Sequence, residues 1–231
     1  MKWGALSVHF FTAAGAFAGL LALERAIAGA YPAMFGWLAL ALLIDGIDGT
    51  LARRLDIRRV VPHVDGDMLD AVVDYLTYVI VPLAAVWNSG MMSGLASMIL
   101  LPLAASASAL YFADRRMKTN DSWFRGFPGL WNVIALYLFV FPMPGWIVAC
   151  VCVLGIIAMF VPIAFVHPVR VRQFRFLTIL VTVLWGVSAV WLVYRQFGDA
   201  ALARFVMLAA VVYFILLPLA RDSIWARDDG Y

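Results

Sequence analysis

Eight apolar runs follow one another along the chain, separated by short stretches that are rich in charge, proline or glycine. A helix needs about 20 apolar residues to cross the hydrocarbon core of a bilayer. Hydrophobic residues make up 65% of the chain and charged residues only 13%, whereas soluble domains carry about a quarter charged residues. A water-soluble domain could not bury so much apolar surface. The runs therefore predict an all-α, polytopic membrane bundle of about eight transmembrane helices.

These helices are predicted to form a single integral membrane domain over residues 1–231. Pro142, Pro144 and Pro162 interrupt or bend the fifth and sixth runs. The first run is long enough to remain a membrane helix, so we expect no cleavable signal peptide. The predicted ranges are about Ala5–Leu23, Pro32–Ala52, Gly66–Asn88, Met91–Ala113, Phe127–Phe141, Gly145–Val166, Phe176–Tyr194 and Ala201–Leu219.

The positions of Lys and Arg predict the orientation. With eight spans, the termini and the loops after the second, fourth and sixth helices share one side of the membrane. That side holds 14 of the 17 Lys and Arg residues, and the other holds Arg25, Arg195 and Arg204. Because basic loops stay on the cytoplasmic side, both termini are predicted to be cytoplasmic. The sequence pI near 9.0 thus has an explanation without nucleic acid, and no such partner is expected.

Four aspartates lie where a membrane helix tolerates them poorly. Asp45 and Asp48 end the second run, and Asp70 and Asp74 lie near the start of the third. An Asp at the centre of a membrane helix costs about 2.5–3.5 kcal/mol, so such residues are functional candidates. Spacings of three and four residues place each pair along one helical face. Asp45 and Asp74 each lie about 12 Å along a helix from the same cytoplasmic loop.

Antiparallel helices joined by that loop would bring the four carboxylates to matched depths. Four like charges in a small, partly dry volume require cations. Hard divalent ions prefer oxygen ligands, and Mn²⁺ or Mg²⁺ fits a site that also binds phosphate. The sequence therefore predicts a divalent-cation site at Asp45, Asp48, Asp70 and Asp74.

Small and basic residues surround these carboxylates. Gly49 and Ala52 share the face of Asp45, and Gly66 precedes Asp70 on its stripe, which leaves room for a flat ligand beside the backbone. Arg53, followed by Arg54, lies at the mouth, where a guanidinium can clamp a pyrophosphate. The alternative for any one residue is packing, because Gly and Ala also serve close helix contacts and a single Asp can pair with Arg.

This segment resembles the signature of the CDP-alcohol phosphotransferase family. Eight fixed positions match in order, with twelve residues between the two halves: Asp45, Asp48, Gly49, Ala52, Arg53, Gly66, Asp70 and Asp74. The gap is longer than the family's usual one. That gap, Gly46 directly after the first Asp and eight predicted spans resemble the bacterial phosphatidylcholine synthase branch. The stretches Met117-Lys-Thr, Gly126-Phe-Pro and Trp131-Asn are also similar to that branch.

The resemblance implies roles for these residues, a homodimeric state and a location in a bacterial inner membrane. The four aspartates would hold a two-ion centre, and Asp74 would also be the general base. The segment lining the cytidine diphosphate site would include Asp45, Gly49, Ala52, Arg53 and Gly66. The implied reaction moves the phosphatidyl group of CDP-diacylglycerol onto choline and releases CMP.

Choline has a quaternary ammonium group, which proteins commonly recognise with aromatic faces. Aromatic residues near the cytoplasmic side supply candidates, although Trp and Tyr also gather at membrane interfaces for other reasons. His9, inside the first predicted helix, could reach the site or be satisfied by a neighbouring helix. The predicted choline-binding residues are Tyr75, Tyr78, Tyr111 and Trp131.

Three alternatives to this function remain open at this point. The acceptor alcohol could be glycerol 3-phosphate, inositol phosphate or serine. An intramembrane prenyltransferase also binds a diphosphate through Asp and Mg²⁺, but its motifs lack the glycine spacing found here. A divalent-cation transporter would favour a site at the bilayer midplane and two related halves, whereas these carboxylates lie off-centre.

Overall fold

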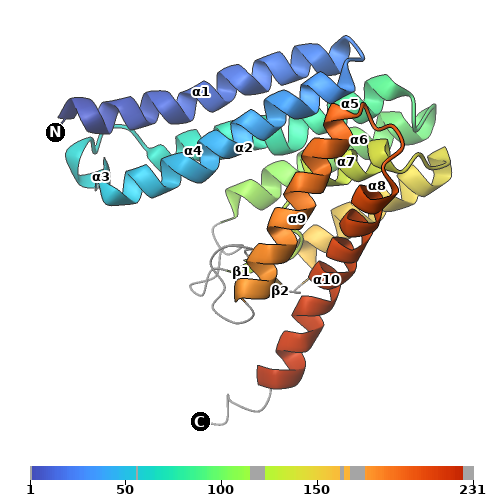
Figure 1. The fold of residues 1–231 in the computed structure, drawn as a ribbon. Helices are drawn as coiled ribbons and strands as arrows, with labels where there is room; N and C mark the ends of the chain where they lie inside the picture. Colours follow the sequence, from blue (N-terminus) through green and yellow to red (C-terminus); the bar gives the residue numbers. More distant parts are fainter. Residues whose placement is uncertain (1, 56, 115–122, 162–163, 167–174, 226–231) are drawn as a thin grey trace.

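The computed structural model describes residues 2–55, 57–114, 123–161, 164–166 and 175–225, and every structural statement below concerns these residues. Met117-Lys-Thr and several of the predicted cytoplasmic Lys and Arg residues lie outside them. The predicted helical membrane bundle is confirmed (Figure 1). Its helices are α1 (Lys2–Ile27), α2 (Tyr31–Arg54), α3 (Ile57–Val60), α4 (Gly66–Asp74), η1 (Tyr75–Ile80), α5 (Val81–Ser89), α6 (Leu95–Ala113), α7 (Trp131–Val140), α8 (Gly145–Phe160), α9 (Arg175–Tyr194) and α10 (Ala201–Trp225).

The first half of the bundle consists of α1, α2 and the continuous helix α4–η1–α5, which lie side by side (Figure 1). Helices α1 and α2 form an antiparallel hairpin whose tight turn uses Gly29 in the left-handed region, at φ +73°. The α2–α4 connection carries the short helix α3. Ile57 and Val61 of this connection pack against Val8, which holds the connection against α1.

Two glycines let α1 approach the third helix closely. A Cβ on Gly15 would lie 2.7 Å from Cγ1 of Val73, and one on Gly19 would lie 2.8 Å from Cδ2 of Leu76. Both distances are shorter than van der Waals contact, so no larger residue fits without displacement. The small residues of α1 therefore set the distance at which it packs on α4 and η1.

A π-helical segment interrupts α4–η1–α5 directly after Asp74. In η1 the Val81 N–H donates to the carbonyl of Leu76, which is an i→i−5 bond. The next residue, Pro82, has no N–H and its ring would clash with the carbonyl of Tyr78 in a regular α-helix. A wider turn avoids that clash, and such π-segments are frequent at functional sites.

In the second half, α6 packs on α8, and α9, which pairs with α10, lies against α2 (Figure 1). Two short strands, β1 (Trp123–Arg125) and β2 (Ala164–Val166), pair antiparallel with Phe124 opposite Phe165. The prediction that the sixth helix continues to Val166 is therefore wrong. Helix α8 ends at Phe160, and Val161 is extended, as expected for the residue before a proline.

The fifth predicted helix also begins later than expected. Residues 126–130 are irregular because Gly126 and Gly129 have φ of +76° and +68°. A Cβ at Gly126 would lie 2.1 Å from the carbonyl oxygen of Met159, so this segment runs against the end of α8. At about 1.5 Å per residue, α7 rises only about 15 Å, half the thickness of the hydrocarbon core.

Five helices of the described chain are long and apolar enough to cross a membrane. These are Leu6–Ile27, Tyr31–Arg54, Gly66–Ser89, Leu95–Ala113 and Arg175–Tyr194. Helices α7 and α8 and the described part of α10 are apolar but shorter. The eight predicted apolar helices thus all exist. That every one of them spans the membrane, and the cytoplasmic position of the termini, remain predictions.

Candidate functional site

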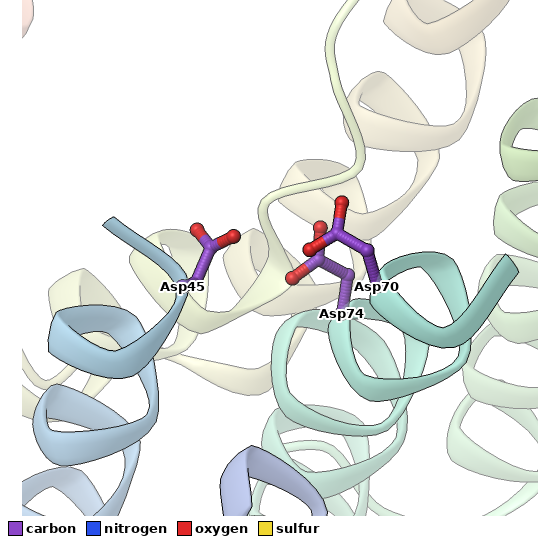
Figure 2. Close-up of side chains that lie close together, drawn as sticks. All are labelled: Asp45, Asp70 and Asp74. Atoms are coloured by element: carbon purple, nitrogen blue, oxygen red, sulfur yellow. The ribbon is translucent and has the colours of Figure 1, made fainter. Parts of the chain in front are cut away.

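Three of the four predicted aspartates converge between α2 and α4. Asp45 comes from α2, and Asp70 and Asp74 come from α4 (Figure 2). One carboxylate oxygen of each residue lies within 4.8 Å of the corresponding oxygens of the other two. All three side chains are half-buried. Figure 2 shows the carboxylates turned toward a shared space between the two helices.

Helix geometry explains this convergence. Asp70 and Asp74 are four residues apart, so they differ by only about 40° around the α4 axis. The start of α4 is set by Asp65, whose carboxylate accepts hydrogen bonds from the N–H groups of Asp67 and Met68 at 3.1 and 3.0 Å. This cap fixes how far Asp70 lies along the helix from the loop that α4 shares with α2.

Asp48 lies apart from this group. A spacing of three residues turns it about 60° around α2 relative to Asp45. Its side chain is 5% exposed and contacts Thr12 of α1. Within the described residues, the converging carboxylates are those of Asp45, Asp70 and Asp74. The role of Asp48 as a metal ligand stays a prediction.

The donor set of the three converging residues suits a hard divalent cation. Ligand oxygens about 2.1 Å from a Mg²⁺ ion lie roughly 3–4 Å from one another. The 4.8 Å span of the carboxylate oxygens reaches that spacing with small side-chain rotations. Three anionic groups so close together repel one another unless positive charge lies between them. The cluster could therefore hold a metal ion.

Several residues predicted to line the nucleotide site lie near the end of α2 and the start of α4. The Arg53 side chain folds back over Gly49, where a Cβ would lie 3.4 Å from its Nη1 atom. Its Nη2 donates to Oγ1 of Thr50 at 3.3 Å. Ala52 packs with the small cluster around Val8. Their contacts with a nucleotide remain predictions.

Gly66 makes room for His9, for which the sequence left open whether it reaches the site or packs against a neighbouring helix. A Cβ at Gly66 would lie 3.2 Å from Cε1 of His9. His9 is 9% exposed, and its Nε2 is buried with no hydrogen-bond partner among the described residues. The structure thus packs His9 on the first turn of α4. The spacing of His9 within an apolar run could not reveal this contact.

Tyr78 is the predicted choline-binding residue that contacts the aspartate group. Its hydroxyl donates to Oδ2 of Asp45 at 2.8 Å, and its side chain is 8% exposed. Sequence reasoning missed this bond. The signal that could have found it is the run Asp70, Asp74, Tyr78, which continues one helical stripe at intervals of four residues.

The other three predicted choline-binding residues make contacts away from the aspartates. The Tyr75 hydroxyl donates to the carbonyl of Ala105 at 3.0 Å. Trp131 is 1% exposed and its Nε1 donates to Ser108 at 2.8 Å. Tyr111 is buried, and its hydroxyl has no partner within the described chain. Trp131 has the environment of a packing residue, and the structure gives no support for its contact with choline.

Comparison with known proteins shows the family. No protein-family model matches the chain. A phosphatidylcholine synthase of Bradyrhizobium diazoefficiens is 47% identical over 192 residues, covering 83% of this chain and 72% of that protein. Phosphatidylcholine synthases of Brucella melitensis and Pseudomonas aeruginosa are 41% and 37% identical, each over 96% of this chain and over 84% and 92% of the relatives. The chain therefore belongs to the phosphatidylcholine synthase family.

Proposed function

We propose that this chain is a divalent-metal-dependent CDP-diacylglycerol–choline phosphatidyltransferase. It joins choline to the phosphatidyl group of CDP-diacylglycerol and releases CMP. Identity of 37–47% over most of the chain to proteins named phosphatidylcholine synthase supports the reaction. The convergence of Asp45, Asp70 and Asp74 is the structural observation that carries the proposal.

Asp45, Asp70 and Asp74 are the residues that would hold the cation, with Asp48 as a predicted fourth ligand. When bound, Mn²⁺ or Mg²⁺ supplies positive charge to the pyrophosphate and to the departing CMP. The carboxylates hold this charge at one position between α2 and α4, which serves to orient the donor. The predicted two-ion centre is part of this proposal.

Asp74 is the proposed general base. The choline hydroxyl has a pKa far above 7, so its proton must be removed as the oxygen attacks the phosphorus. The choline O–P bond forms, the P–O bond to CMP breaks, and the proton passes to a carboxylate oxygen of Asp74. Asp74 lies at the end of α4, next to the π-segment, and its neighbour Asp70 is on the same stripe.

Arg53 and the small residues of α2 and α4 are proposed to bind the nucleotide end of the donor. Arg53 is exposed and its guanidinium lies over Gly49, so it can turn toward a pyrophosphate without breaking an ion pair that the structure records. Planar guanidinium groups bind phosphate oxygens through two parallel hydrogen bonds. Gly49, Ala52 and Gly66 complete this proposed site.

Recognition of the choline ammonium group falls to aromatic faces near the site. Tyr75 and Tyr111 remain candidates, since the ring of Tyr75 is half-buried and the Tyr111 hydroxyl lacks a described partner. The proposed setting is a bacterial inner membrane, with the site opening to the cytoplasm and the protein forming a homodimer. The excess of Lys and Arg on one side of the membrane supports the orientation.

The test is product formation by protein purified into nanodiscs with CDP-diacylglycerol. Labelled choline, serine, glycerol 3-phosphate and inositol phosphate are supplied separately, with Mn²⁺, Mg²⁺ or a chelator. We expect a choline-dependent lipid product and CMP only in the presence of a divalent cation. Product with a different acceptor would replace choline but keep the transferase. Absence of CMP release with every acceptor would overturn the proposed function.

A further inference from the structure

The Tyr78 hydroxyl contacts the aspartate cluster, and the proposed reaction assigns it no task. It lies on η1, opposite α2, and donates to Oδ2 of Asp45 at 2.8 Å. At 8% exposure the ring is enclosed by neighbouring side chains. A residue so buried, whose single proton is already committed to a carboxylate, has little surface left for an acceptor alcohol.

The geometry of this helix places the Tyr78 hydroxyl next to Asp45. Tyr78 follows Asp74 by four residues, so it continues the stripe of Asp70 and Asp74 on the side that faces α2. The π-segment that contains it is stabilised by the Val81 N–H bond to Leu76 and accommodates Pro82. The wide turn thus lies where Tyr78 must reach across to Asp45.

A hydrogen bond to the half-buried carboxylate of Asp45 has two physical effects. It holds Oδ2 in place and so fixes the orientation of the Asp45 carboxylate, which lies beside Asp70 and Asp74 (Figure 2). It also offsets part of the desolvation of the carboxylate, because hydrogen bonds to ionised groups are roughly twice as strong as neutral ones. Groups that orient metal ligands in this way commonly change metal affinity about 10–100-fold.

We propose that Tyr78 is a positioning residue for the cation site, acting through Asp45, and that it does not bind the acceptor. The inference rests on the proposed function only in requiring that the aspartate cluster binds a divalent cation. It predicts that Asp45 binds the cation through one oxygen while Tyr78 holds the other.

The test is Mn²⁺ binding without substrate, followed by electron paramagnetic resonance of the free ion. The protein is held in nanodiscs of zwitterionic lipid, so that anionic headgroups do not bind Mn²⁺. Tyr78→Phe, which keeps the ring, is expected to weaken binding about 10–100-fold. The matched control is Tyr75→Phe, which removes another hydroxyl of the same π-segment. That hydroxyl donates to the Ala105 carbonyl and not to the aspartates among the described contacts. Its Mn²⁺ affinity is expected to stay within about twofold of the unaltered protein.

A double variant tests whether Tyr78 acts through Asp45. Asp45→Asn is expected to weaken Mn²⁺ binding, and adding Tyr78→Phe is expected to weaken it no further. In turnover, Tyr78→Phe should raise the Mn²⁺ concentration for half-maximal rate and leave the KM for choline unchanged. Independent losses in the double variant, or a raised choline KM with unaltered Mn²⁺ binding, would overturn the inference.

The two proposals fail in different ways. An unaltered protein that binds Mn²⁺ but makes no lipid product would remove the proposed function and leave the role of Tyr78 intact. Choline transfer by a protein that binds no Mn²⁺ would remove the role of Tyr78 and leave the transferase.

Discussion

The two halves of the bundle use buried polar groups differently. In α1–α5, Thr12 contacts Asp48 and Tyr78 donates to Asp45, so polar side chains meet carboxylates. In α6–α10, the partners of buried polar groups are other uncharged groups. These pairs are Trp131 with Ser108, Tyr137 with Trp185 and with the Met207 carbonyl, and Thr178 with Tyr213.

Polar groups in α1–α5 thus contact charged side chains, whereas those in α6–α10 join neighbouring helices through neutral hydrogen bonds. Neutral hydrogen bonds between helices contribute about 0.6 kcal/mol each inside a membrane. Carboxylates in the same environment are tolerated because they serve a function. The comparison teaches that a polar residue bonded to a carboxylate of the first half is expected to affect chemistry, and one bonded only to neutral groups to affect stability.

The largest expected effect comes from Asp74→Asn, which keeps the shape of the side chain but cannot accept the choline proton. We expect the rate of choline transfer to fall about 10²–10⁴-fold, the usual contribution of a general base. The measurement is CMP release by the purified variant. Asp199→Asn is the control, since Asp199 pairs with Arg204 on the α9–α10 turn and should leave the rate unchanged. Equal loss in both variants would contradict a specific role for Asp74.

Substituting glycines in the two halves should change stability in opposite directions. Gly15→Ala places a Cβ against Val73, and overpacking of this kind destabilises by up to about 3 kcal/mol. Gly186→Ala in α9 meets nothing within 4 Å and should stabilise its helix by about 0.5–1 kcal/mol. Unfolding of both variants in detergent by titration with a denaturing surfactant measures the difference. Similar behaviour of the two variants would show that α1 does not pack as closely as described.

Trp131→Phe tests whether the second half contributes to acceptor binding. The change removes the Nε1 bond to Ser108 and leaves a cavity where the larger indole ring was packed, so it should destabilise the fold by about 2 kcal/mol. The KM for choline of the folded fraction should be unchanged, because Trp131 is closed into the contact of α7 with α6 and α8. A raised choline KM with unaltered stability would show that Trp131 contributes to the acceptor site, and that the second half also takes part in the chemistry.

Gly66→Ala tests what the space at the start of α4 is for. The added Cβ would lie 3.2 Å from His9, so the ring must shift, at about 1 kcal/mol. If that room exists for His9, combining the change with His9→Ala should restore stability. If Gly66→Ala also raises the KM for CDP-diacylglycerol, and the double variant regains stability but keeps the raised KM, the nucleotide lies beside Gly66. Thermal unfolding and the donor KM are measured on the same samples.

The sequence by itself determined the membrane class, the eight apolar helices and the spacing of the aspartates. These features follow from local physics, because a bilayer requires long apolar helices and the period of a helix decides which residues share a face. Proline and glycine limited the accuracy of the boundaries. Gly126 and Gly129 delay α7, and the residue before Pro162 ends α8 earlier than hydropathy alone suggests.

Only the tertiary structure decided which of these residues meet. The spacing of Asp45 and Asp48 allowed both to face the site, but the position of α1, set by Gly15 and Gly19, makes Asp48 contact Thr12. Tyr78 and Trp131 looked equivalent as aromatic residues near one side of the membrane. One donates to Asp45 and the other to Ser108. Contacts between helices depend on their relative rotation and distance, which many distant residues determine together and which no local pattern records.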